Sequence, residues 1–157
     1  MNFLEHLAAE YYQHQGYYVR LNVRVLPRPN GGFGGELDVL AFEPKKKILA
    51  HIETSWDALT WSARKTRFLR KFRFSEAQYR EILGLQFKTL VQRVVTGGTL
   101  SVPKAEKWND IEILTTPIFL REVGAYLRDK HPGRKAVPEH MPCLRSIQFY
   151  SHYAERA

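Results

Sequence analysis

The stretch that decides the fold is GELDVLAFEPKKKILAHIETS, residues 35–55. Two apolar, β-prone runs flank a Pro-Lys turn, which predicts a β-hairpin. If the strands fold back symmetrically about the lysines, paired residue numbers sum to 91 and Asp38 faces Glu53. Carboxylates opposed at roughly 5 Å repel each other unless a positive charge lies between them, and a divalent cation suits such oxygens. The hairpin therefore predicts a cation site, provided that its register does not slip by one residue.

Polar side chains share one face of the second predicted strand. His51, Glu53 and Ser55 alternate with apolar residues, because successive side chains of a strand point to opposite faces. The apolar face, which we assign to the core, consists of Ile48, Ala50 and Ile52. Exposure at a sheet edge would be the structural reason for the polar face. His51 is expected to be a hydrogen-bonded structural residue, with proton transfer as the alternative.

Composition indicates a single globular domain over residues 1–157, in which 44% of the residues are hydrophobic. No run of 18 or more apolar residues occurs, so no membrane span is expected. The N-terminus lacks the pattern of a secretory signal. Cys143 is the only cysteine, which excludes an internal disulfide and suggests a reducing cytoplasmic location.

The net charge of +8 favours a polyanionic partner, and much of the positive charge follows the hairpin. Residues 57–73, DALTWSARKTRFLRKFR, predict a helix with one acid and many bases. Its apolar stripe comprises Ala58, Trp61, Phe68, Leu69 and Phe72. Like charges at helical spacing disfavour a helix unless a polyanion compensates them. We therefore predict nucleic-acid contacts, DNA first, from Arg64, Lys65, Arg67, Arg70 and Lys71.

A helix is predicted over residues 2–15, with Asn2 as its cap and Glu5 completing a capping box. Glu10 lies next to the apolar face of this helix, and its pattern by itself favours a solvated helix glutamate without a functional role. A strand follows over residues 17–26, with its odd-numbered apolar residues expected on one side. The glycine-rich segment 30–35 lacks a following helix and a Lys-Ser/Thr pair, so it predicts a mobile connection rather than a nucleotide loop.

The rest of the chain alternates between helices and strands. The expected elements are helices over 75–85 and 117–130, strands over 87–95 and 111–114, and a polar loop over 99–110; the tail 144–153 is left unassigned. The early strands predict a meander, and the later ones are separated by enough chain for crossovers. This order predicts an α/β or α+β fold, a central mixed sheet flanked by helices.

These residues resemble the restriction-endonuclease-like PD-(D/E)XK nuclease superfamily. The likeness rests on a helix with a glutamate, then GGELDVLAF, a turn and LAHIETS, and it covers about residues 3–127, leaving 131–157 as an extension. It implies an αβββαβ core and cleavage of nucleic acid with Mg²⁺ or Mn²⁺. It also implies that Asp38 and Glu53 are catalytic and that Glu10 joins them as a metal ligand.

The chain departs from the superfamily motif at Ser55, where a lysine is usual. That lysine normally positions the attacking water and offsets negative charge on the phosphate, which a serine cannot do. Some members take the amine from the following helix instead. Lys71 and Lys65 are the candidates here, and Lys71 is preferred because it shares a stripe with Arg64 and Arg67.

The expected function is that of a metal-dependent endonuclease of restriction, repair or mobile-element type. Ser55 leaves open an inactive nucleic-acid-binding module on the same fold. A basic subunit that docks an acidic protein is the third hypothesis. A double-strand cut by one site per chain would need two chains, so a homodimer is a further expectation.

Overall fold

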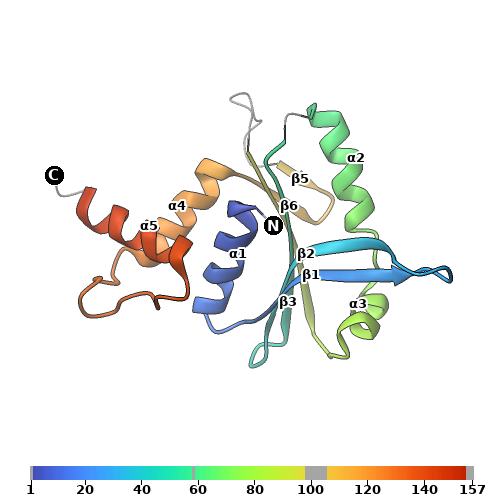
Figure 1. Ribbon diagram of the computed structural model, residues 1–157, viewed down its shortest axis with the longest axis horizontal. Coiled ribbons are helices and arrows are strands. Elements are labelled where there is room, and N and C mark those ends of the chain that lie inside the picture. The colour runs from blue at the N-terminus through green and yellow to red at the C-terminus, as the bar shows by residue number, and fades with distance from the viewer. Residues whose placement is uncertain (1, 58, 98–105, 155–157) are drawn as a thin grey trace.

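The chain forms an α+β fold in which a mixed sheet separates two groups of helices (Figure 1). The computed structural model describes residues 2–57, 59–97 and 106–154. The helices are α1 (Phe3–His14), α2 (Trp61–Lys71), α3 (Glu76–Leu83), α4 (Thr116–Leu127) and α5 (Pro142–Tyr153). The strands are β1 (Tyr18–Pro27), β2 (Phe33–Glu43), β3 (Ile48–Ser55), β4 (Thr89–Thr96), β5 (Glu106–Trp108) and β6 (Ile111–Thr115).

The six strands lie in the order β1-β2-β3-β4-β6-β5. β1, β2 and β3 form the predicted antiparallel meander, and α2 and α3 carry the chain over to β4, which pairs with β3 in parallel. β6 lies parallel to β4 and antiparallel to β5, a strand within the segment predicted as a loop. β3 is thus an interior strand, and exposure at a sheet edge does not explain its polar face, because His51, Glu53 and Ser55 are buried.

The register predicted for the β2–β3 hairpin is confirmed. Val39 pairs with Ile52 and Leu40 with His51, so each pair sums to 91. Backbone pairing ends there, one position short of Asp38. The alternation of the two strands then puts Asp38 and Glu53 together on the sheet face that carries α2 and α3.

The alternation of β1 predicts that its odd-numbered apolar residues lie on one side of the sheet. They do not. Leu21 packs into the core beneath α1, whereas Val23 packs on the α3 side of the sheet. The reason is Asn22, whose φ of 51° is left-handed and reverses the sequence of faces. Leu21 pairs with Val39 and Val23 with Leu37, so Asn22 would be expected to pair with Asp38, but this pair is not formed. The pairing of β1 with β2 is therefore interrupted beside Asp38.

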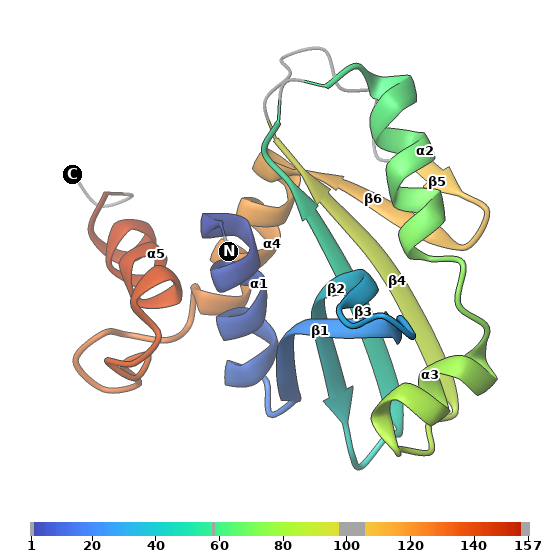
Figure 2. The same ribbon diagram turned by 45° about the vertical axis from the view of Figure 1, so that its right-hand side comes forward.

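Apolar side chains fill both faces of the sheet. One core lies between the sheet and α1, α4 and α5, and two smaller ones lie beneath α3 and α2 (Figure 2). The unassigned tail becomes α5, packed on α1 and α4. No helix in the described part of the chain is long and apolar enough to cross a membrane.

The helix predicted over residues 57–73 begins at Trp61. Thr60 caps it by accepting a hydrogen bond from the Ala63 N–H, while Asp57 accepts one from the Leu59 N–H in the preceding turn. Ala58, expected in the apolar stripe, lies outside the described residues. The predicted capping boxes of α1 and α3 are both present.

Candidate active site

Asp38 and Glu53 meet at one ammonium group. Lys71 Nζ lies 2.6 Å from Asp38 Oδ1 and also contacts Glu53 Oε2. Two oxygens that touch the same nitrogen lie within the roughly 6 Å over which charges couple strongly. The expected proximity of the two acids is therefore confirmed, and Lys71 supplies the positive charge that the pair requires.

Side chains replace the missing strand-to-strand hydrogen bonds around the two acids. The Asp38 N–H donates to Glu53 Oε1 at 3.1 Å, and the Thr54 N–H donates to Asp38 Oδ2 at 2.9 Å. His51 is fully buried, with Nε2 2.7 Å from Glu53 Oε1 and Nδ1 2.6 Å from the Tyr79 hydroxyl. His51 thus orients Glu53 from the protein interior, which fits the structural interpretation of this histidine.

The electrostatics of the three groups differ. Burial and the charge of Glu53 raise the pKa of Asp38, although Lys71 opposes them. Burial opposes the charge of Glu53, but hydrogen bonds and charge from His51 and Lys71 hold its pKa below the usual value. Burial also opposes the charge of Lys71, but the two carboxylates outweigh it and raise its pKa. As the pH falls, Asp38 is therefore the acid that takes up a proton first.

Glu53 Oε2 is buried and forms an ion pair with Lys71 Nζ. Lys71 is therefore the cation that this oxygen contacts in the structure.

An open cavity of about 310 Å³ lies over the acids. Its walls include Asp38, Glu53, Lys71 and also Glu5, a carboxylate to which no site role had been assigned. Asn2 ties the start of α1 to β3 through a hydrogen bond from Nδ2 to Thr54 Oγ1 at 3.2 Å, which brings Glu5 to the cavity. The sequence predicts the capping-box role of Glu5, but only the packing of α1 against β3 shows that Glu5 also lines this cavity. Within the described ranges, no three His, Cys, Asp or Glu side chains are grouped closely enough to enclose a metal ion.

Glu10 does not join the acids, and the prediction that it completes their site is wrong. Its Oε2 accepts the Leu144 N–H at 2.7 Å, and its side chain is buried between α1 and α5. Met141, the N-cap residue of α5, makes no side-chain cap. Glu10 fills that role, because a carboxylate is favourable at a helix N-terminus.

Arg64 is also misassigned as a nucleic-acid contact. Its side chain is fully buried, with Nε 3.0 Å from Asp57 Oδ1 and Nη1 3.4 Å from Thr96 Oγ1. It lies on the stripe of α2 that faces the sheet, so phosphate cannot reach it. Asp57, which is partly exposed, pairs with the buried guanidinium and compensates its charge, as a buried cation requires.

The other basic residues of α2 stay accessible. Arg67 lines the cavity over the acids, and its Nη1 lies 2.6 Å from Asp57 Oδ2. Lys65 and Arg70 are exposed. Lys65 Nζ lies 5.5 Å from the centroid of the Trp108 ring, so of the two candidate lysines it is Lys71 that reaches the acids.

Ser55 lines the same cavity, at the position where the superfamily motif has lysine. Its hydroxyl donates to Asp57 Oδ2 at 2.6 Å. That bond and those from Arg64 outweigh the effect of burial and hold the pKa of Asp57 below its usual range. Lys71, from the neighbouring helix, brings its amine to the acids in place of a side chain at position 55.

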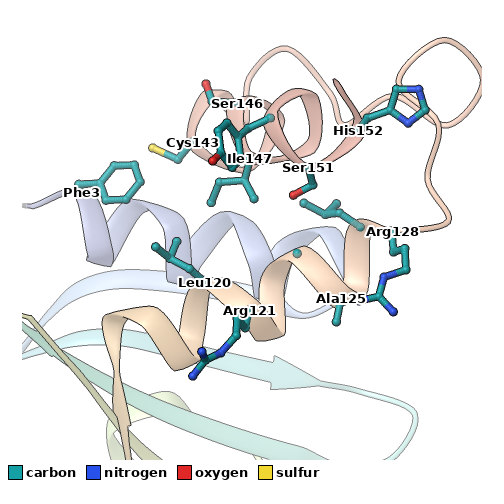
Figure 3. Close-up of a pocket in the computed structure, with 13 residues that line it drawn as sticks. Phe3, Leu120, Arg121, Ala125, Arg128, Cys143, Ser146, Ile147, Ser151 and His152 are labelled. Carbon is teal, nitrogen blue, oxygen red and sulfur yellow. The ribbon is translucent and has the colours of Figure 1, made fainter. Parts of the chain in front are cut away.

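A larger hollow of about 1000 Å³ lies between α4 and α5, on the other side of the sheet (Figure 3). Leu120 and Arg121 of α4 line it together with Cys143 and Ile147 of α5, and Phe3 lies at one end. None of the described residues that line it is a carboxylate, whereas the cavity over Asp38 and Glu53 has carboxylates beside an amine. We therefore take the acid–lysine cluster as the candidate site.

Comparisons with known proteins identify no function. No protein-family model matches the chain, and no curated protein matches it. A solved crystal structure of a protein of unknown function, AF1548, is similar over 98% of this chain and 92% of that chain. The sequence identity is 14% and the TM-score is 0.42.

Proposed function

We propose that this chain is a metal-dependent nuclease of the PD-(D/E)XK type that hydrolyses phosphodiester bonds of DNA. One observation carries the proposal: Asp38 and Glu53, from neighbouring strands, converge with Lys71 at the wall of an open cavity. Two acids and an amine are the groups that this chemistry uses. They arise from separate elements of the chain, which makes their meeting informative.

The donor set fits a divalent ion. Carboxylate oxygens are the ligands that Mg²⁺ and Mn²⁺ prefer, and Glu53 Oε2 already holds a cation, the Lys71 ammonium, with which a metal ion would compete. Asp38 and Glu53 would hold the ion, and Glu5 and Asp57 are further carboxylates on the cavity wall. Such an ion would polarise the phosphate and lower the pKa of a bound water.

The remaining groups suit a phosphate chain. Lys71 stays charged, since its pKa is raised, and can offset negative charge on a phosphate at the acids. Arg67 adds a guanidinium at the same wall. Beyond Lys71, a second cavity of about 390 Å³ is lined by Arg70 and Arg73. These side chains would hold the backbone of the strand on either side of the cut.

A second candidate is a module that binds nucleic acid without cutting it. It is favoured by the ion pairs themselves, because Lys71 already pairs with both acids without a metal. In that case the cluster stabilises the sheet, and the exposed bases of α2 carry the binding.

Calorimetric titration with Mn²⁺ and a plasmid-nicking assay separate the two candidates. The nuclease should bind Mn²⁺ and nick DNA, and Asp38→Ala or Glu53→Ala should abolish both. Glu10→Gln is the matched control, since Glu10 is a buried acid away from the cluster. DNA binding with neither Mn²⁺ heat nor nicking would instead establish the second candidate. A chain that binds no DNA even at low salt would overturn both.

We further propose that the nuclease works as a homodimer in the cytoplasm. One cluster per chain cuts one strand, so a double-strand cut needs two copies. The single cysteine is compatible with a reducing compartment. Analytical ultracentrifugation with and without DNA tests the dimer.

A further inference from the structure

Two large aromatic side chains are exposed beside the acid–lysine cluster. Trp56 follows the last residue of β3, is 63% exposed and lines the cavity over Asp38 and Glu53. Phe3, at the start of α1, is 54% exposed. Both line an adjoining cavity of about 350 Å³. Two exposed rings that line one cavity next to a polar site offer apolar faces on which a flat ligand can stack.

Trp56 is supported by the backbone rather than held in the core. A Cβ at Gly97 would lie 2.2 Å from Trp56 Cε3 and 2.4 Å from Cζ3, so the ring occupies the space of a side chain at position 97. The Gly97 N–H donates to the Ser55 carbonyl at 2.8 Å, which holds the two backbones together. The indole is therefore supported at one side and open to solvent elsewhere.

Phe3 is brought to the same place by the start of α1. Asn2 forms the capping box with Glu5 and also bonds Thr54, two residues before Trp56. These bonds connect the first turn of α1 to the end of β3. Trp56 is thus held on the wall of the cavity over the acids, and Phe3 lies with it on the wall of the adjoining cavity.

We infer that Trp56 and Phe3 form a stacking platform for an unpaired nucleobase beside the phosphate at Asp38 and Glu53. This inference rests on the proposed function and specifies its substrate class: DNA with an unpaired nucleotide at the cut. Bases inside a duplex have both faces covered by their neighbours, whereas an unpaired base offers a face to an aromatic ring. Any base can stack on an aromatic ring, so the platform distinguishes unpaired from paired DNA and does not distinguish one sequence from another.

Binding to a labelled oligothymidylate in EDTA tests the platform without cleavage. Stacking contributes roughly 1–3 kcal/mol per base, which corresponds to roughly 5- to 150-fold weaker binding for Trp56→Ala. Trp56→Phe should keep most of the affinity but lose the quenching of tryptophan fluorescence on binding. Tyr150→Ala is the matched control, since Tyr150 is 73% exposed on α5. It should bind as the wild type does.

The wild type should also bind the single strand more tightly than the same sequence as a blunt duplex at equal salt. Equal affinities, or wild-type affinity in Trp56→Ala, would overturn the platform. The nuclease proposal would survive that outcome if Asp38→Ala still abolished nicking. Failure of the wild type to bind any DNA would overturn the platform together with the nuclease.

Discussion

Replacing Lys71 with methionine would leave two buried carboxylates without their shared cation. Methionine keeps much of the length and apolar stem of the lysine but removes its charge. Lys71 Nζ touches both Asp38 and Glu53, and the Glu53 side chain has no exposed surface. The substitution therefore measures how much the Lys71 charge stabilises the fold.

The magnitude follows from the contacts. Removing one partner of a buried ion pair costs about 3–5 kcal/mol. Both acids keep other partners, since His51 and two backbone N–H groups still bond them, and Lys71 is 29% exposed. We expect the lower end, about 3 kcal/mol. For a chain of 157 residues this lowers the Tm by roughly 6–12 °C.

Urea and thermal unfolding followed by circular dichroism, with and without Mn²⁺, measure the effect. Lys65→Met is the control, because it removes the same charge from an exposed position on α2 and should change stability by less than about 1 kcal/mol. Mn²⁺ at a hundredfold excess over its Kd adds about 2.7 kcal/mol. At equal Mn²⁺ concentration, it should stabilise Lys71→Met more than the wild type, in which Lys71 competes for the same oxygens.

Two results would refute this reasoning. An unchanged Tm in Lys71→Met would mean that the acids do not depend on the lysine. A Tm lowered as expected, but insensitive to Mn²⁺, would mean that the acids do not take a cation.

Four further outcomes are expected. Arg64→Met should lower the free energy of unfolding by about 3 kcal/mol in urea, because it leaves a buried network without its cation. Arg70→Ala should leave stability unchanged but reduce the slope of log affinity for DNA against log salt by about 0.9. Glu10→Gln should cost about 1 kcal/mol through the cap of α5, while Mn²⁺ titration stays unchanged. Asp38→Asn should stabilise the fold at neutral pH, because a raised pKa means that the charged form opposes folding. That gain should shrink as the pH falls through the raised pKa and Asp38 takes up a proton, which urea unfolding at neutral and acidic pH would show.

Local patterns carried the prediction of the meander and of the two acids. The register of the β2–β3 hairpin follows from a symmetric turn and from alternation, both of which act over a few residues. The preference for Lys71 came from helical spacing, and its reach to Asp38 agrees with it. Such short-range rules apply wherever neighbouring residues alone decide which way a side chain points.

Errors arose where a side chain had a choice of neighbours. Periodicity placed Glu10 beside the apolar face of α1, but only packing shows that α5 covers it. Arg64 and Arg70 look alike in sequence, yet one faces the sheet and the other faces solvent. The alternation of β1 gave no sign that Asn22 would reverse it.

The sequence by itself determined the mixed α+β fold, the hairpin register and the pairing of Asp38 with Glu53, because these depend on periodicity and turn chemistry. Only the tertiary structure decided which further charges join the acids. The docking of α1 brings Glu5 to the cavity, that of α2 brings Lys71, and Gly97 leaves room for Trp56. These contacts join residues far apart in the chain, and their choice depends on how whole elements pack to bury apolar surface.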